Sequence, residues 1–151
     1  TLILTLFPYT TLFRSTIGRL KTARRLSEQR PPEMPPLQVC IEVNIAGEEA
    51  KHGVAPDEAV ALAVEVAKLP NVVVRGLMCV AKADSDDEAL RVQFQTMQKL
   101  LADLNAAGVC ADVLSMGMSG DMPVAVACGA THVRIGSAIF GRREPKGKDS
   151  Q

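Results

Sequence analysis

The chain has 151 residues, with 17 basic and 17 acidic side chains, so its formal net charge is zero. Hydrophobic residues make up 47% and charged residues 23%, which is the composition of an ordinary globular domain. A zero net charge argues against a broad nucleic-acid footprint or a polybasic membrane patch. We therefore expect neither nucleic acid nor a membrane as a partner.

The first segment, residues 1–15, differs from the rest of the chain. It is apolar, carries Arg14 as its only charge and is interrupted by Pro8. It therefore lacks the basic start of a signal peptide and the length of a membrane span. The segment also resembles the translated sequencing adapters found at the ends of metagenomic fragments. We expect residues 1–15 to be non-native and the native sequence to begin near Thr16.

The four cysteines are far apart in the sequence and form no Cys-x-x-Cys pair; they are Cys40, Cys79, Cys110 and Cys128. This spacing is typical of neither a zinc site nor a secreted disulfide framework. Because each cysteine lies beside apolar residues, we expect four buried thiols. A reducing compartment, the cytoplasm, fits this pattern best.

The remaining chain alternates between strand and helix patterns. Alternating or continuous apolar runs predict four strands, at 37–45, 72–78, 111–116 and 131–135. Helical patterns fall before and between them, at 17–29, at 56–68, from Ser85 to Gly108, after Gly120 and from Ser137. The first of these helices is basic and amphipathic.

Two of the predicted helices begin with specific signals. Pro56, followed by two acidic residues, suits the first turn of a helix and its dipole. Ser85 and Glu88 form the Ser-x-x-Glu pattern of a capping box, in which each side chain bonds the other residue's backbone amide.

The connections between strands are too long for hairpins, so parallel strands with covering helices are expected. An open doubly wound sheet and part of a (β/α)8 barrel both fit this order. On strand 37–45 the apolar residues occupy odd positions, and Gln38, Glu42 and Asn44 share the other face. A strand covered on both sides is apolar on both faces, so this polar face favours half a barrel of about four β/α units. An edge strand with a solvated face is the alternative.

Two glycine-serine loops have the features of a phosphate site. The first follows strand 111–116 and places Gly117, Ser119 and Gly120 before a helix. Glycine allows close backbone approach, and the hydroxyl and free helix amides attract an anion. The second loop repeats the pattern with Gly136 and Ser137.

Arg134 lies on the strand that precedes the second loop, where it would point into a barrel mouth as a fixed cation. A phosphate site after the last two strands is typical of such barrels. Gly-Met-Ser-Gly-Asp also approaches the nucleophile elbow of serine hydrolases, but Asp121 replaces its last glycine. Neither His52 nor His132 is placed to complete a triad, so anion binding is favoured.

The stretch LSMGMSGDMPVAVACGATHVRIGSAIFGRR (114–143) resembles the C-terminal signature of the YggS-type pyridoxal phosphate homeostasis proteins. Residues 43–54 and 74–78 resemble the preceding strands and loops of that family, and 16–37 its preceding helix and linker. The resemblance covers residues 16–144. It implies an alanine-racemase-like (β/α)8 barrel, of which 16–144 is the C-terminal half, with a polar tail at 145–151.

The resemblance also implies pyridoxal 5′-phosphate as the cofactor. Residues of both loops match the positions that hold its phosphate, namely Met118, Ser119, Gly136 and Ser137. Arg134 matches an arginine near the phosphate and the pyridine ring. Asn44 and Met78 match positions that line the same cavity.

In this family a lysine near the end of the first barrel strand forms a Schiff base with the cofactor, and we expect that strand to have no counterpart here. Lys51 and Lys82 lie in loops and match no family lysine. The resemblance implies storage and delivery of the cofactor, with pyridoxal-phosphate-dependent apoenzymes as recipients and no catalysis. An enzyme of the same cofactor class, a racemase or decarboxylase, is one alternative. A barrel for another phosphate ligand, or an interaction module, is the other.

Overall fold

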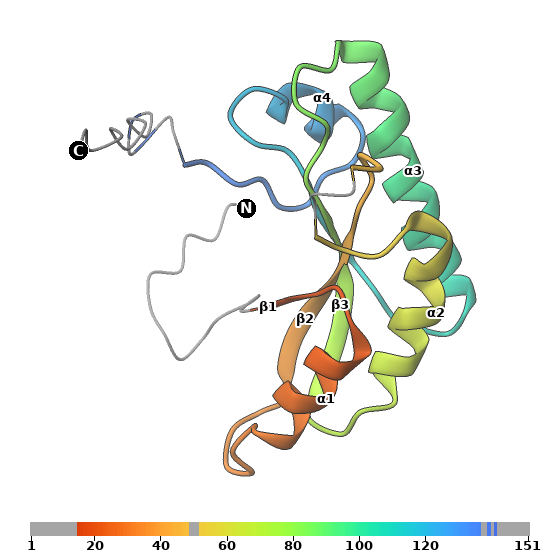
Figure 1. Cartoon of the computed structure of the whole chain (residues 1–151), viewed down its shortest axis with the longest axis vertical. Coiled ribbons are helices and arrows are strands. Elements are labelled where there is room, and N and C mark those ends of the chain that lie inside the picture. The colour runs from red at the N-terminus through yellow and green to blue at the C-terminus, as the bar shows by residue number, and fades with distance from the viewer. Residues whose placement is uncertain (1–14, 49–51, 137–138, 140, 142–151) are drawn as a thin grey trace, which may run out of the picture.

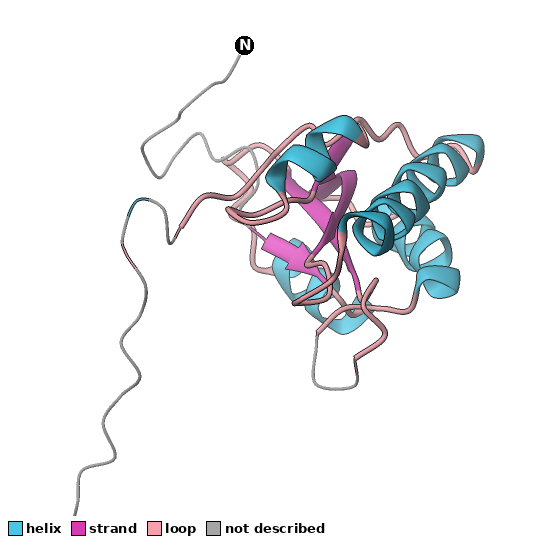
Figure 2. Cartoon of the chain, turned by 90° about the horizontal axis from the view of Figure 1, so that it is seen from above, coloured by secondary structure: helices cyan, strands magenta, loops and turns pink. Residues whose placement is uncertain are grey.

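The computed structural model describes residues 15–48, 52–136, 139 and 141. Within these residues strands and helices alternate in the order β1 (Ser15–Ile17), α1 (Leu20–Glu28), β2 (Leu37–Val43), α2 (Pro56–Ala67), β3 (Val72–Cys79), α3 (Asp87–Ala106), β4 (Val113–Ser115) and α4 (Met122–Ala127). The strands form one parallel sheet in the order β1-β2-β3-β4, and α2 and α3 lie side by side against one of its faces (Figures 1 and 2). The alternation and the parallel sheet are what the sequence predicts, and β2, β3 and β4 coincide with three of the four predicted strands.

The two faces of the sheet differ as the alternation in β2 predicts. Val39 and Ile41 are fully buried on the face that the helices cover, whereas Gln38 and Glu42 on the other face are half-buried. Ile17, the register partner of Ile41, is also fully buried. Burial of these branched side chains against the helices stabilises the sheet, and it leaves a second face that carries polar groups.

Strands β3 and β4 approach each other too closely for a side chain at Gly76. A Cβ atom added there would lie 1.9 Å from the carbonyl oxygen of Val113. The register between β2 and β3 also shifts at Val39/Cys40, so Arg75 is an extra residue on β3. The close approach of β3 and β4 therefore requires glycine at position 76.

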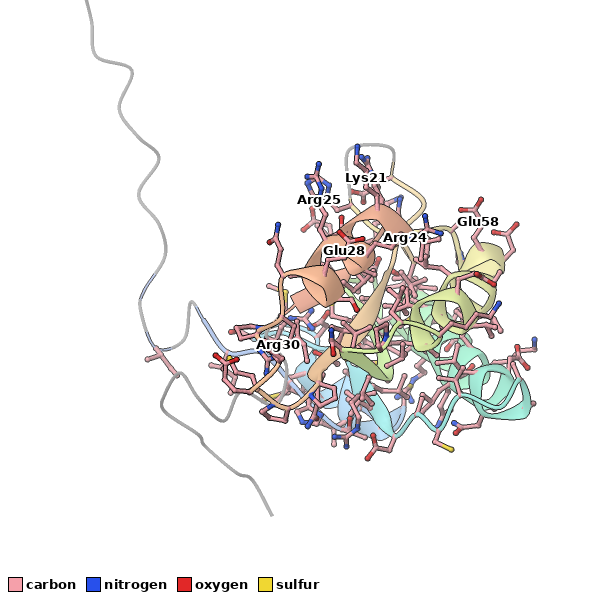
Figure 3. All side chains as sticks on the ribbon, turned by 90° about the horizontal axis from the view of Figure 1, so that it is seen from below. Lys21, Arg24, Arg25, Glu28, Arg30 and Glu58 are labelled. Atoms are coloured by element: carbon pink, nitrogen blue, oxygen red, sulfur yellow. The ribbon has the colours of Figure 1, made fainter. Side chains whose placement is uncertain are left out.

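Helix α1 has the amphipathic character that the sequence predicts. Ala23 and Ser27, four residues apart, are buried. Lys21, Arg24 and Arg25 are exposed on its outer surface (Figure 3). The start of this helix differs from the prediction, because Ile17 belongs to β1 and the helix begins only at Leu20.

The prediction of a strand at 131–135 is wrong. This segment makes a single parallel bridge, between His132 and Ser115. Further backbone hydrogen bonds join this segment to β4 and the loop beyond it: the amide of Thr131 donates to the carbonyl oxygen of Leu114, and that of Arg134 to the carbonyl oxygen of Gly117, each at 3.0 Å. The fourth strand of the sheet is β1 instead. The helical turn predicted from Ser137 lies outside the described residues.

Two smaller expectations are also wrong. Asp86 caps α3, because its carboxylate accepts a hydrogen bond from the backbone amide of Ala89 at 2.8 Å, so the predicted Ser85 capping box does not form. A charged oxygen at this position also suits the positive end of the helix dipole. Cys110 is exposed, whereas the other three cysteines are buried. Among the described helices, none is both long and apolar enough to cross a membrane.

Candidate functional site

The carboxyl ends of the strands gather polar side chains on the open face of the sheet. Glu42, Met78 and Ser115 are register partners on β2, β3 and β4, and all three are half-buried. The Glu42 carboxylate accepts a hydrogen bond from the Thr16 hydroxyl at 3.1 Å, which fixes it toward β1. Because parallel strands end at the same edge, the loops that follow them meet above this row.

Arg134 is held at this edge by acceptors that carry no charge. Its Nη1 donates to the carbonyl oxygen and the hydroxyl of Ser115, each at 2.9 Å, and its Nη2 donates to the carbonyl oxygen of Cys79 at 2.7 Å. Its backbone amide donates to the carbonyl oxygen of Gly117 at 3.0 Å. No carboxylate of the described residues forms a salt bridge with it. The guanidinium is therefore fixed in position and keeps its full positive charge.

Cys79, whose carbonyl oxygen holds Arg134, has a buried thiol. Burial raises the pKa of Cys79 to about 12, and the positive charge of Arg134 opposes that rise. The thiol is therefore protonated at neutral pH, which makes it a packing group and not a nucleophile.

The loop after β4 turns sharply because of one glycine. A Cβ atom at Gly117 would lie 2.6 Å from the Cβ of Ala125 in α4, and its φ of +96° disfavours any other residue. The turn that follows has Ser119 and Gly120 at its exposed tip. Gly120 has ordinary backbone geometry, and an added Cβ would meet nothing within 4 Å. The tight turn that the sequence predicts for both glycines is therefore formed by Gly117.

The amides of this loop are less available than the sequence suggests. The carboxylate of Asp121 accepts the backbone amide of Met118, and the amide of Met122 donates to the carbonyl oxygen of Met118 at 2.9 Å. The next residue, Pro123, has no amide proton. Fewer free amides therefore remain at the start of α4 than the sequence predicts, and the amide of Met118 is not one of them.

A cavity of about 520 Å³ lies between this loop and the loop after β3. It is lined by Val80, Ala81, Lys82, Ala83, Asp84, Ser85, Leu90, Met118, Gly120 and Asp121. The side chain of Met118 is 45% exposed, so it contributes apolar surface to the cavity wall. One wall is held in place by α3, because the side chain of Gln93 accepts the amide of Lys82 at 2.9 Å.

Asn44 brings an unsatisfied acceptor to the same edge of the sheet. Its Nδ2 donates to the carbonyl oxygen of Glu48 at 2.9 Å, but its Oδ1 is buried and has no partner among the described residues. A buried polar atom without a partner is costly, so it marks a place where a donor is missing.

The structure thus brings Asn44, Met78, Met118, Ser119 and Arg134 to one edge of the sheet. Gly136, two residues beyond Arg134, is exposed, and an added Cβ would meet nothing within 4 Å. Ser137 lies outside the described residues. The binding roles of these residues stay predictions.

Sequence reasoning missed two residues of this edge. Ser115 was detectable, because alternation along its strand places it on the polar face with Glu42 and Met78. Asp121 carried a weaker signal, a carboxylate three residues after Met118, which is the spacing of a side chain that bonds the amide at a helix start.

Residues 11–144 match the model of one protein family, the alanine racemase N-terminal domain. The chain belongs to this family. The expected boundaries at 15/16 and 144/145 stay predictions; β1 begins at Ser15 and the family match at residue 11.

Curated relatives and solved structures support the same assignment. The chain is 48% identical over 129 residues to the pyridoxal phosphate homeostasis protein of Pseudomonas aeruginosa. This match covers 85% of the chain and 55% of the relative. It spans about half the length of the curated relatives it matches. The crystal structure of an unknown protein from Bifidobacterium adolescentis has a TM-score of 0.79 at 32% identity, covering 85% of this chain and 53% of that one. PipY of Synechococcus elongatus has a TM-score of 0.72 at 30% identity, covering 83% and 59%. The predicted resemblance and the alanine-racemase-like α/β fold are confirmed.

Proposed function

We propose that this chain is the phosphate-holding part of a protein that binds pyridoxal 5′-phosphate and maintains its supply in the cell. The observation that carries the proposal is Arg134, a fixed and un-neutralised cation beside the Gly117 loop. The relatives support it, since the Pseudomonas protein is named for pyridoxal phosphate homeostasis and PipY has been solved with this cofactor bound.

The residues present fit a ligand with a phosphate and a flat ring. Arg134 supplies positive charge, Ser119 lies at an exposed turn, and the backbone at Gly136 has open space beside it. We propose that these residues, with Ser137 and the apolar side of Met118, hold the phosphate.

The ring end of the ligand would lie over the row of side chains at the strand ends. Met78 offers a half-buried apolar surface there, and the buried Oδ1 of Asn44 is an acceptor that a donor on the ligand would satisfy. When bound, the cofactor supplies an aldehyde that reacts reversibly with amines. The residues of this chain bind and orient it.

We further propose that the protein acts in the cytoplasm as a carrier and not as an enzyme, and that pyridoxal-phosphate-dependent apoenzymes are its recipients. The names of the relatives support this role.

The test measures ligand retention by equilibrium dialysis, with pyridoxal phosphate and with pyridoxal, which lacks the phosphate. The chain should hold pyridoxal phosphate at least about tenfold more tightly, because hydrogen bonds to charged groups contribute more than neutral ones. Arg134→Ala should weaken pyridoxal phosphate binding about tenfold to a hundredfold, and should weaken pyridoxal binding less, because pyridoxal lacks the phosphate charge.

Arg75→Ala is the matched control, since it removes an arginine from the same face near the other end of the strands. Equal retention of pyridoxal phosphate and pyridoxal would refute the phosphate site. Equal displacement by any phosphate monoester would favour a barrel for another phosphate ligand.

A further inference from the structure

The proposed phosphate loop contains a carboxylate of its own. The Asp121 side chain accepts the amide of Met118, while the Asp121 amide donates back to the carbonyl oxygen of Met118 at 3.2 Å. This reciprocal pair closes the turn that carries Ser119 and Gly120. Asp121 therefore determines the shape of the loop from within.

The same side chain brings a negative charge to a place where an anion is expected. Asp121 is half-buried and lines the cavity beside Met118. Its charge reaches the strand ends: burial is the main cause that raises the pKa of Cys79, and the charge of Asp121 adds to the rise while Arg134 opposes it. The carbonyl oxygen of Cys79 is one of the acceptors that hold Arg134. Asp121 and Arg134 thus act on one region with opposite signs.

We propose that Asp121 is a positioning residue that shapes the phosphate loop and whose charge also weakens the hold of that loop on the phosphate. The inference rests on the proposed function. A phosphate group carries between one and two negative charges at neutral pH, so a fixed carboxylate nearby repels it. Asp121 also occupies the Met118 amide, a donor that a bound phosphate would otherwise use.

Weak retention suits a protein that passes its ligand on. Differences in affinity between related complexes appear mostly in the dissociation rate. A carboxylate inside the loop keeps the loop folded without ligand and speeds release of the phosphate. Arg134 supplies the opposing attraction, so the balance between these two side chains determines how long the ligand stays.

Two substitutions separate the shape from the charge. Asp121→Asn keeps an oxygen acceptor for the Met118 amide and removes the charge, whereas Asp121→Ala removes both. We expect Asp121→Asn to bind pyridoxal phosphate about threefold to tenfold more tightly, through slower dissociation. Asp121→Ala should bind it more weakly than Asp121→Asn does, because the loop loses its closing bond. Pyridoxal binding should be the same in wild type and Asp121→Asn.

The gain in Asp121→Asn should shrink as salt is added, because screening weakens repulsion between partly exposed charges. Asp103→Asn is the control: it also removes one negative charge, on the far part of α3, where Asp103 pairs with Lys99. It should leave pyridoxal phosphate binding unchanged. Asp121→Ser, which keeps a short uncharged acceptor, is the second variant if Asp121→Asn does not fold.

The outcomes distinguish this inference from the proposed function. If the wild-type chain prefers pyridoxal phosphate over pyridoxal but Asp121→Asn binds it equally or more weakly, the role of Asp121 is wrong and the phosphate site stands. If the wild type shows no preference for the phosphate, the site and the inference fail together. An equal gain in Asp103→Asn would show that net charge alone is responsible.

Discussion

Two arginines on the open face of the sheet have opposite environments. Arg75 lies near the amino ends of the strands, where its Nε and Nη2 bind both carboxylate oxygens of Asp112 at 2.9 and 2.7 Å, and it also donates to the side chain of Gln38. Arg134 lies at the carboxyl ends, where two carbonyl groups and the Ser115 hydroxyl hold it. The first charge is neutralised, and the second is not.

This difference separates a structural cation from one that is available to a ligand. Arg75 ties the start of β4 to β3 and has its charge satisfied within the chain. Arg134 is equally fixed, but its neutral partners leave its charge to attract an anion. A fixed cation without a carboxylate partner, beside a glycine-serine loop, is therefore the best indication of function in the chain.

The largest expected loss of stability comes from a substitution that separates β3 from β4. Gly76→Ala would place a Cβ atom 1.9 Å from the carbonyl oxygen of Val113, so β3 and β4 must separate. We expect a loss of about 2–4 kcal/mol in the free energy of unfolding, measured by urea denaturation. Gly120→Ala is the control, since its Cβ meets nothing and its stability should change by less than about 0.5 kcal/mol. Equal stability of the two variants would contradict the close approach.

A smaller loss of stability is expected when the carboxylate partner of Arg75 is removed. Asp112→Asn removes the charge that neutralises Arg75 and should cost less than about 1 kcal/mol, because the Asp112 side chain is 65% exposed and solvent screens the pair. Ligand binding at the Arg134 end should not change.

The stabilisation by this pair should depend on pH in one direction. Hydrogen bonds from Arg75 lower the pKa of Asp112 below its ordinary value. The folded state therefore favours the ionised carboxylate, and this stabilisation is complete above the unfolded pKa of about 3.9. It is lost as the pH falls through the lowered pKa. The difference in unfolding free energy between wild type and Asp112→Asn should shrink at acid pH, and a constant difference down to pH 2 would argue against the ion pair.

The smallest expected effect concerns the reactivity of the thiols of Cys40 and Cys79. Burial raises the pKa of Cys40 and of Cys79 to about 12, and Arg75 and Arg134 respectively oppose the rise. Labelling with a disulfide reagent at pH 8 should therefore modify exposed Cys110 first and leave Cys40 and Cys79 protected. Cys110→Ser should remove the fast phase, and a fast phase that persists would show that a buried thiol is accessible.

Much of the architecture was predictable from local patterns. Alternation in 37–45 correctly assigned one buried and one polar face, and Pro56 correctly marked the start of α2. Ile17 and the segment 131–135 were assigned to the wrong elements, because three-residue strands and single bridges leave no periodic pattern. Their state depends on whether a neighbouring strand offers hydrogen-bonding partners in register.

The candidate site divides in the same way. The sequence by itself determined the residue types at the strand ends: the glycine-serine loops, an arginine just before the second of them and the polar face with Asn44. Only the tertiary structure decided how they are used. Arg134 bonds a carbonyl 55 residues away on β3, and Asp121 takes the Met118 amide that the loop pattern offered to an anion. Side-chain patterns report which groups are present, whereas strand register and loop closure decide which donors and charges remain for a ligand.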